Sequence, residues 1–395
     1  MTYTTPASEL LATELLSGNK HGFEKAYFVG SGSEAMDAAL KFARQYHFER
    51  GDRGRVHYIA RKQSYHGNTV GALSVSSHVK RKEVYVDEGV LQLGNVSWVS
   101  PAYYYQYGDW RGGESEEEYK DRLVRELEEE IVSVGKERVI AFVAETYSGA
   151  TMGCVPAPKG YWKGVREVCD RYGVLLVLDE VMCGSGRVGT WWAFEGEEET
   201  EGVRPDLVTL GKGLGGGMSP IAAVVLGERV CEGLRQGIGK EKGDVKHGHT
   251  YQAHPVSCAS SLAVLKILKR DGLMQRCKEM GVVLERLLRA RLGDRQFVGN
   301  IRGNGLFWGI EFVKDRSTRE SLDPSLGFGP RYQLKVFEKG VAIYPGAGTV
   351  DGVKGDHVIV SPAYIVNETE LEYVVDKMRR VYDEMETELL GSTTA

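Results

Sequence analysis

Short apolar runs rich in β-branched residues alternate with amphipathic helical patterns from about residue 25 to residue 265. The runs are continuous stretches of apolar residues, as expected for strands that are buried on both faces of a parallel sheet. This alternation predicts an α/β domain with a largely parallel sheet. The expected strands are 25–30, 55–60, 138–145, 174–179, 206–210 and 220–226, and the clearest helices between them are 33–49 and 116–134.

The pattern changes after about residue 265. A helical stretch over 258–292, broken near Gly272, is followed by shorter expected strands at 306–313 and 357–361 and by a last amphipathic helix over 368–388. These elements predict a smaller α+β domain. The expected organisation is an N-terminal segment at 1–24, a large ligand-binding α/β domain at 25–262 and a small C-terminal domain at 263–395. The charged, glycine-rich stretches 107–118 and 195–204 are expected to be surface loops.

Charge and composition argue against several classes of function. The formal net charge is −5, so nucleic acid is not expected to be a main partner. No run approaches the ~18 apolar residues of a membrane span, and the N-terminus lacks the pattern of a secretory signal. The six cysteines are widely spaced without a C-x-x-C motif, which favours reduced thiols. We therefore expect a cytoplasmic protein with no membrane partner.

Glycine is unusually frequent, with 50 of the 395 residues against an average usage of about 7%. The first cluster, Gly30-Ser31-Gly32-Ser33, lies between an expected strand and an expected helix. Backbone N–H groups and two hydroxyls at a helix N-terminus form a site for an anion. The alternative is an ordinary turn in which Ser33 caps the helix.

Three further motifs follow expected strands. Tyr65 precedes a His-Gly pair and can place its ring over a flat ligand, although most such tyrosines are simply packed. Asp179 closes a buried strand at the sheet edge where α/β ligands bind, and a buried carboxylate there needs a cationic partner. Its alternative role is a structural ion pair or a helix cap. Lys212 is flanked by glycines at another strand end, where a buried lysine could act as a nucleophile.

Other patterns are weaker. The stretch 184–189 matches G-x-G-x-x-G, but residues 179–183 separate it from the strand and no amphipathic helix follows it. Gly213 stands where a P-loop needs Ser or Thr after the lysine. The histidines at 247, 249 and 254 lack a supporting carboxylate pattern, so no metal site is expected.

An anion cradle, a stacking aromatic, a buried aspartate and an accessible lysine on one sheet together specify a ligand. It needs a phosphate, an aromatic ring with a protonatable nitrogen and an aldehyde for the lysine. These are the groups of pyridoxal phosphate (PLP).

The chain resembles the class III aminotransferases (ω-type, subgroup II) of PLP fold type I from about residue 24 to residue 385. The resemblance implies a mostly parallel seven-stranded sheet, a smaller α+β C-terminal domain, and a homodimer with shared active sites. It also implies that the segment 1–24 is short for the family. The best-matched segments are 28–46, 64–76, 175–195, 206–225 and 247–259.

The resemblance implies a role for each site residue. Lys212 would form the Schiff base with PLP, and Asp179 would pair with the pyridine nitrogen. Glu145 corresponds to the family's active-site glutamate. The other cofactor-binding residues would be Ser31, Gly32 and Ser33 at the phosphate, Tyr65 and Val181 on the two faces of the ring, and Thr250, which would reach the phosphate from the partner subunit.

Two departures from the family concern substrate binding. Relatives that act on α-amino acids have an arginine where alignment on Pro362 places Ile359. Amine:pyruvate-type relatives have a mobile arginine in the loop 346–356, which here offers only Lys354. We therefore expect a substrate amine that is remote from any carboxylate or lacks one, with Lys354, Arg187 or Arg302 as candidates to compensate.

The expected function is transfer of an amino group from an amine or amino acid to a keto acid, aldehyde or ketone. One alternative is a PLP-dependent racemase, decarboxylase or aminomutase on the same scaffold. Another is an NAD(P) oxidoreductase that uses the stretch 184–189. A third is a non-catalytic dimeric scaffold.

Overall fold

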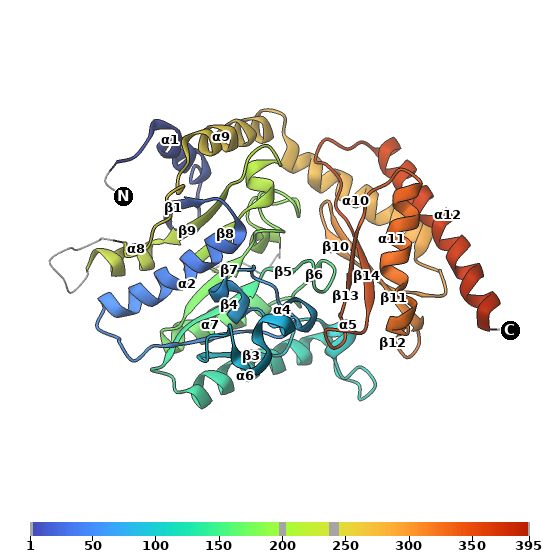
Figure 1. Cartoon of the computed structure of the whole chain (residues 1–395), viewed down its shortest axis with the longest axis horizontal. Helices are drawn as coiled ribbons and strands as arrows, with labels where there is room; N and C mark the ends of the chain where they lie inside the picture. The colour runs from blue at the N-terminus through green and yellow to red at the C-terminus, as the bar shows by residue number, and fades with distance from the viewer. Residues whose placement is uncertain (1–2, 197–202, 237–244, 394–395) are drawn as a thin grey trace.

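A computed structural model of the chain describes residues 3–196, 203–236 and 245–393, arranged around a large and a smaller sheet (Figure 1). The large sheet has seven strands. Their order across the sheet is β1 (Phe23–Val29), β9 (Ala222–Gly227), β8 (Leu207–Leu210), β7 (Leu175–Asp179), β4 (Val139–Glu145), β2 (His57–Arg61) and β3 (Val96–Val99).

The large sheet is mostly parallel, as predicted. Strands β8, β7, β4, β2 and β3 pair in parallel, whereas β9 runs antiparallel to both β1 and β8. Each of the expected strands is present. The additional strand β3 is short and half-buried, with a serine and a tryptophan between its two valines, so it lacked the continuous apolar run that marked the others.

The continuous runs arise because both sheet faces are covered. Along β4, Phe142 faces one apolar core and Val143 faces another. The first core includes side chains of α6 (Glu116–Val134) and α7 (Tyr161–Tyr172), and the second includes those of α2 (Gly32–Glu49) and α8 (Glu228–Arg235). Burial of both faces contributes about 25 cal/mol per Å² of apolar surface removed from water.

The smaller sheet is antiparallel and belongs to the C-terminal part of the chain. Its strands lie in the order β10 (Val298–Asn304), β11 (Phe307–Asp315), β14 (Asp356–Val360) and β13 (Tyr344–Ala347), with β12 (Glu320–Ser321) paired to β11. A third core joins this sheet to α10 (Leu273–Leu292), α11 (Phe328–Glu338) and α12 (Glu368–Thr393), which lie on the right of Figure 1.

The expected break near Gly272 is present. Gly272 has φ +61°, a conformation that favours glycine, and separates α9 (Pro255–Arg270) from α10. The stretch 107–118 is a loop up to Ser115, which caps α6 together with Glu118. The expected loop at 195–204 lies largely outside the described residues. The domain limits at 24 and 262 remain predictions.

The remaining short elements connect these layers. Helix α4 (Val79–Val86), which follows α3 (Val70–Val75), contributes Arg81 to the wall of the site described below. The connecting helices are α1 (Pro6–Leu15), α3 (Val70–Val75), α4 (Val79–Val86) and α5 (Tyr104–Tyr107); the short strands are β5 (Tyr147–Ser148) and β6 (Val155–Pro156); and the 3₁₀ turns are η1 (Asp87–Gly89), η2 (Ala193–Gly196), η3 (Lys212–Gly215) and η4 (Pro324–Leu326).

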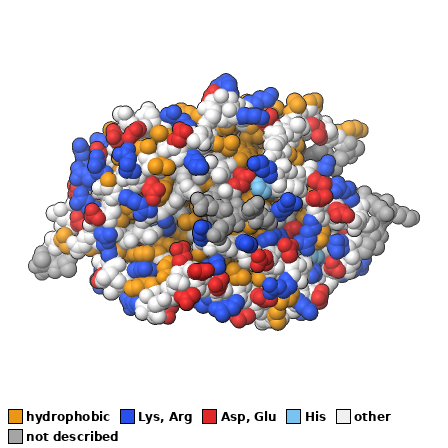
Figure 2. Space-filling view, turned by 180° about the vertical axis from the view of Figure 1, so that it is seen from behind, with side chains coloured by type: hydrophobic (Ala, Val, Ile, Leu, Met, Phe, Trp, Pro, Cys, Tyr) orange, Lys and Arg blue, Asp and Glu red, His pale blue; other side chains and the backbone are white. Residues whose placement is uncertain are grey.

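The molecular surface carries charges of both signs. On the face shown in Figure 2, lysine and arginine side chains are interspersed with aspartate and glutamate. None of the helices in the described ranges is both long enough and apolar enough to cross a membrane.

Candidate active site

A cavity of about 730 Å³ lies at the carboxyl ends of the parallel strands. This is the sheet edge at which α/β proteins bind their ligands. The connections that follow β1, β2, β4, β7 and β8 all contribute to its wall. Of the predicted site residues, Ser31, Gly32, Ser33, Tyr65, Glu145, Asp179, Val181 and Lys212 line this cavity.

The glycine-serine turn after β1 forms the N-terminus of α2. Ser31 is the N-cap, and its hydroxyl accepts a hydrogen bond from the N–H of Glu34 at 3.3 Å. The cap is therefore Ser31 and not Ser33, whose hydroxyl instead accepts from the N–H of Asn68 at 3.0 Å. Because the first N–H groups of a helix have no intrahelical acceptor, those of Gly32 and Ser33 can bind an anion.

Val181 packs closely against two glycines. A Cβ added to Gly32 would lie 2.7 Å from Cγ1 of Val181, and one added to Gly211 would lie 3.0 Å from the same atom. Any side chain at these positions would push Val181 aside. The two glycines thus allow both the helix N-terminus and the lysine turn to pack against one small apolar side chain.

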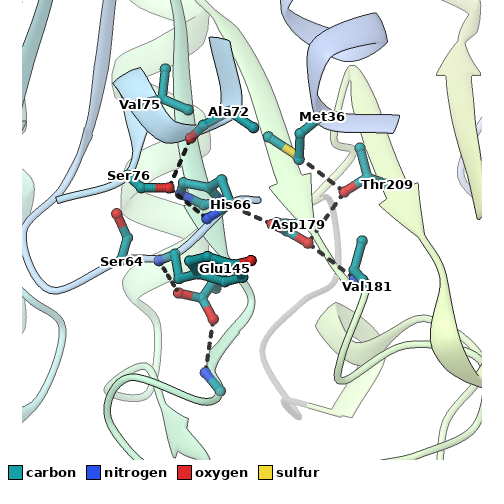
Figure 3. Close-up of polar contacts among 12 residues, drawn as sticks. Met36, Ser64, His66, Ala72, Val75, Ser76, Glu145, Asp179, Val181 and Thr209 are labelled. Atoms are coloured by element: carbon teal, nitrogen blue, oxygen red, sulfur yellow. Dashed lines mark hydrogen bonds and ion pairs between the residues drawn. The ribbon is translucent and has the colours of Figure 1, made fainter. Parts of the chain in front are cut away.

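Asp179 is buried, and both of its carboxylate oxygens are hydrogen-bonded (Figure 3). Oδ2 lies 2.9 Å from Nδ1 of His66. Oδ1 accepts from the N–H of Val181 at 3.0 Å and from the hydroxyl of Thr209 at 3.3 Å. Asp179 can therefore hold a proton on a ligand nitrogen without reorienting. Its expected cationic partner is a histidine, which is charged only when protonated.

His66 directly follows Tyr65 in the predicted motif, and the sequence alone predicts no role for it. Its own backbone N–H donates to the hydroxyl of Ser76 at 2.8 Å, and its ring is buried. The pairing of His66 with Asp179 joins residues far apart in the chain. The position of His66 directly after Tyr65 was the one available signal.

Glu145 ends β4 beside Asp179 in the parallel register. One carboxylate oxygen accepts from the N–H of Tyr65 at 3.1 Å and the other from the N–H of Gly149 at 2.8 Å. Burial raises the pKa of Glu145. Both oxygens are thus used to hold the backbone of neighbouring loops, and one of these bonds places the turn that carries the Tyr65 ring.

Lys212 opens η3 with φ +37°, an unfavourable conformation for a residue with a side chain. Such strain costs about 1–3 kcal/mol and occurs often at functional sites. The side chain is exposed and lines the cavity, so the lysine is accessible, and it lacks the burial that would favour a nucleophilic amine. An exposed amine in this position is accessible to a ligand carbonyl.

Thr250 does not line this cavity. It is exposed on the wall of a neighbouring cavity of about 590 Å³. The two cavities share Gly30, Ser31, Pro220 and Ile221. Thr250 thus lies on the outer side of the same helix N-terminus.

The three candidate cations for the substrate also lie outside the cavity wall. Nη1 of Arg187 donates to the carbonyls of Leu306 and Pro362 at 3.2 and 2.6 Å. Lys354 is exposed in the turn before β14. Nη1 of the third candidate, Arg302, forms a buried ion pair with Glu311 at 2.8 Å. None of the three therefore reaches the cavity as a free cation in the described part of the chain.

The structure brings two further residues into the cavity, Arg81 of α4 and Tyr344 of β13. The guanidinium of Arg81 lies 4.7 Å from the centroid of the Tyr65 ring, and its Nη2 donates to the Tyr344 hydroxyl at 3.2 Å. Sequence reasoning missed both residues. The basic stretch around Arg81 looks like a solvated helix, and nothing in it signals a partner on another sheet.

These groups suit a ligand with an anionic group at the helix N-terminus, a flat ring between Tyr65 and Val181, a basic ring nitrogen at Asp179 and a carbonyl at Lys212. Across the described ranges, no group of three or more His, Cys, Asp or Glu residues could hold a metal ion. The polar groups that line the cavity therefore suit an organic phosphate as the ligand.

Comparisons with known proteins agree with this chemistry. A family model described as Aminotransferase class-III matches residues 1–382. An aminotransferase of Gibberella zeae is 44% identical over 383 residues, covering 95% of this chain and 72% of that protein. A diaminobutyrate–2-oxoglutarate transaminase of Halomonas elongata is 35% identical over 329 residues, 83% of this chain and 68% of that protein. A solved PLP-bound amine transaminase from an uncultivated Pseudomonas species has a TM-score of 0.86 at 29% identity, covering 97% of this chain and 82% of that chain.

Proposed function

Because the chain belongs to the class III aminotransferases, enzymes that transfer amino groups with the help of PLP, we propose that the cavity described above is its active site and that Lys212 is the catalytic lysine. The observation that supports this most strongly is the meeting of the α2 N-terminus, the His66–Asp179 pair and Lys212 in one cavity. These groups come from separate strand ends, and each matches one group of the cofactor.

The residues present fit the cofactor. The N–H groups of Gly32 and Ser33, with the hydroxyls of Ser31 and Ser33, would bind the phosphate at the positive end of the α2 dipole. Tyr65 and Val181 would hold the ring between them. When bound, PLP supplies an electron-withdrawing ring that stabilises negative charge on the carbon next to the amino group.

Asp179 and Lys212 would perform the proton chemistry. Asp179, fixed by His66 and Thr209, would hold a proton on the ring nitrogen. Lys212 would bind the cofactor covalently and be released by the incoming substrate amine. Its free Nζ would then move the proton to and from the reacting carbon, a role that needs the accessible position it has in the cavity.

Replacing Gly32 by alanine tests the proposed phosphate site. The new Cβ would lie 2.7 Å from Cγ1 of Val181, and such overpacking costs about 1–3 kcal/mol. We expect the dissociation constant for PLP, measured by fluorescence titration of the apoenzyme, to rise about tenfold or more. Gly94→Ala, at a glycine with open space around it, is the matched control. Equal affinity in both variants would place the phosphate elsewhere.

The proposed donor is an amine whose amino group is remote from a carboxylate or that has none. Ile359 is buried in β14, where relatives acting on α-amino acids have an arginine, and Arg187 and Arg302 are bonded elsewhere. The Halomonas relative is named for diaminobutyrate and 2-oxoglutarate. We propose the same class of exchange for this chain, with a keto acid as acceptor.

The active form is proposed to be a cytoplasmic homodimer in which Thr250 reaches the partner's phosphate site. Large apolar side chains are exposed around the two adjoining cavities: Met218 and Tyr251 are each 75% exposed and Val256 is 69% exposed. Such a patch is typical of an interface. All six cysteines lie in the described residues, buried and unpaired, as suits a reducing compartment.

Sedimentation velocity tests the dimer. We expect the wild-type protein to sediment as a dimer and Tyr251→Asp to shift it toward monomer, because a charge would replace an apolar contact. Tyr373→Asp, at an exposed tyrosine of α12, should leave the dimer intact. An active wild-type monomer would refute shared active sites.

The reaction itself is tested with a panel of amine donors. The purified enzyme should convert a donor to its keto or aldehyde product and, in a second half-reaction, aminate pyruvate or 2-oxoglutarate in equal amount. Both products are quantified by chromatography. A donor that changed only its stereochemistry would favour a racemase, and a donor that lost only CO₂ would favour a decarboxylase. A protein that kept its cofactor but performed no half-reaction would favour a non-catalytic scaffold.

A further inference from the structure

Arg81 lines the cavity and has no counter-ion among the described residues. It is the one arginine among the described residues that line the cavity, and its side chain is half-buried. Tyr65 offers a π face to its guanidinium and Tyr344 accepts one of its hydrogen bonds. Within the described ranges it has no carboxylate partner, so most of its donors remain available.

The two carboxylates that line the same cavity are already committed. Asp179 is bonded to His66, Thr209 and the N–H of Val181. Glu145 is bonded to the N–H groups of Tyr65 and Gly149. Among the described residues neither forms an ion pair with Arg81, and moving either carboxylate toward it would break the hydrogen bonds that hold Tyr65 and the His66–Asp179 pair.

The surroundings of Arg81 are those of an anion-binding arginine. Its planar guanidinium is stacked on an aromatic ring, which orients the N–H fork and reduces the entropy lost when a ligand binds. The hydrogen bond to Tyr344 links α4 to β13 of the smaller sheet at the cavity wall. A carboxylate suits this fork because guanidinium and carboxylate groups form paired, charge-assisted hydrogen bonds.

We propose that Arg81 binds the carboxylate of the substrate, so that the enzyme takes an acidic amine donor or a keto acid acceptor with its carboxylate beside Tyr65 and Tyr344. This inference rests on the proposed function of the cavity. Arg81 of α4 would then be the cation that Arg187, Lys354 and Arg302 do not provide at the cavity wall.

Binding of an unreactive probe tests the proposal without turnover. Isothermal titration calorimetry of the holoenzyme would use glutarate, which has carboxylates but no amino or keto group, and the neutral glutaramide of the same length. We expect glutarate to bind and glutaramide to bind much more weakly. Arg81→Gln should weaken glutarate binding about 10-fold to 100-fold, and Arg81→Lys should weaken it less because it keeps the charge.

A matched control removes a stacked arginine elsewhere. The guanidinium of Arg53 lies 4.6 Å from the Phe48 ring at the surface, outside the cavity wall. Arg53→Gln should bind glutarate like the wild type. In steady-state assays, Arg81→Gln should raise KM for a keto acid by a similar factor while leaving KM for an aldehyde acceptor of the same length unchanged.

The outcomes separate this inference from the proposed function. Unchanged glutarate binding in Arg81→Gln, or no glutarate binding by the wild type, overturns the role of Arg81. An equal rise in KM for acid and aldehyde overturns it as well, because a merely structural role through Tyr65 would affect both. Arg81-dependent glutarate binding in a protein that transfers no amino group would support the carboxylate site and refute the proposed function.

Discussion

Replacing Lys212 by alanine is expected to lower kcat for amino transfer by at least about 10²–10⁴-fold, the usual contribution of a positioned acid–base group. Lys212 is the one lysine among the described residues that line the cavity, so no other amine there could take over its proton transfer. The variant should fold normally, since the side chain is exposed and makes no core contact. The rate is measured by single-turnover product analysis with saturating donor.

A surface lysine provides the comparison for this variant. Lys314→Ala removes an exposed side chain of β11 that forms an ion pair with Glu320 and should leave kcat unchanged. If added small amines partly restored the activity of Lys212→Ala, the group missing from the variant would be a base. Activity within tenfold of the wild type would exclude Lys212 as the catalytic lysine.

Asp179→Asn is expected to produce the second-largest loss, about 10²–10³-fold in kcat. The substitution keeps the shape of the side chain but removes the negative charge that would hold a proton on the ring nitrogen. It also leaves His66 Nδ1, at 2.9 Å from Oδ2, facing an amide in place of a carboxylate. The measurements are kcat and the absorbance spectrum of the bound cofactor.

The structure offers another His–Asp pair as a control for this substitution. Nδ1 of His47 lies 3.9 Å from Asp52, which is exposed shortly after the end of α2 and does not line the cavity. Asp52→Asn should change neither kcat nor the spectrum. If Asp179→Asn behaved in the same way, Asp179 would be a structural residue only.

The large sheet could be predicted because the burial of its strands leaves a mark in each short stretch of sequence. Strands such as 139–145 and 175–179 are buried on both faces, and that condition requires an unbroken apolar run that is visible in the sequence. The short strand β3 and the strands β10 and β13 of the smaller sheet lack such runs. Val298–Asn304 contains two glycines, an arginine and two asparagines, and only its pairing with β11 makes it a strand.

The cavity residues divide in the same way, into those marked by the local sequence and those placed only by tertiary packing. The meeting of Ser31–Ser33, Tyr65, Asp179 and Lys212 in one cavity could be predicted because each lies at or shortly after the end of an apolar strand, and parallel strands end at one edge. The partners of these residues could not be predicted, since His66 meets Asp179 and Arg81 meets Tyr344 only through tertiary packing. Arg187 illustrates the reverse case: sequence reasoning makes it a candidate to bind the substrate carboxylate, whereas its guanidinium donates to the carbonyl of Pro362.

Covalent trapping of the cofactor tests most directly whether Lys212 is the residue that holds PLP. The holoenzyme is reduced with borohydride, digested and analysed by tandem mass spectrometry, which identifies the lysine that carries the pyridoxyl group. We predict stoichiometric modification of Lys212 in the wild type and none on any lysine in Lys212→Ala. Modification of another lysine, or no modification of a protein that transfers amino groups, would contradict the proposed site.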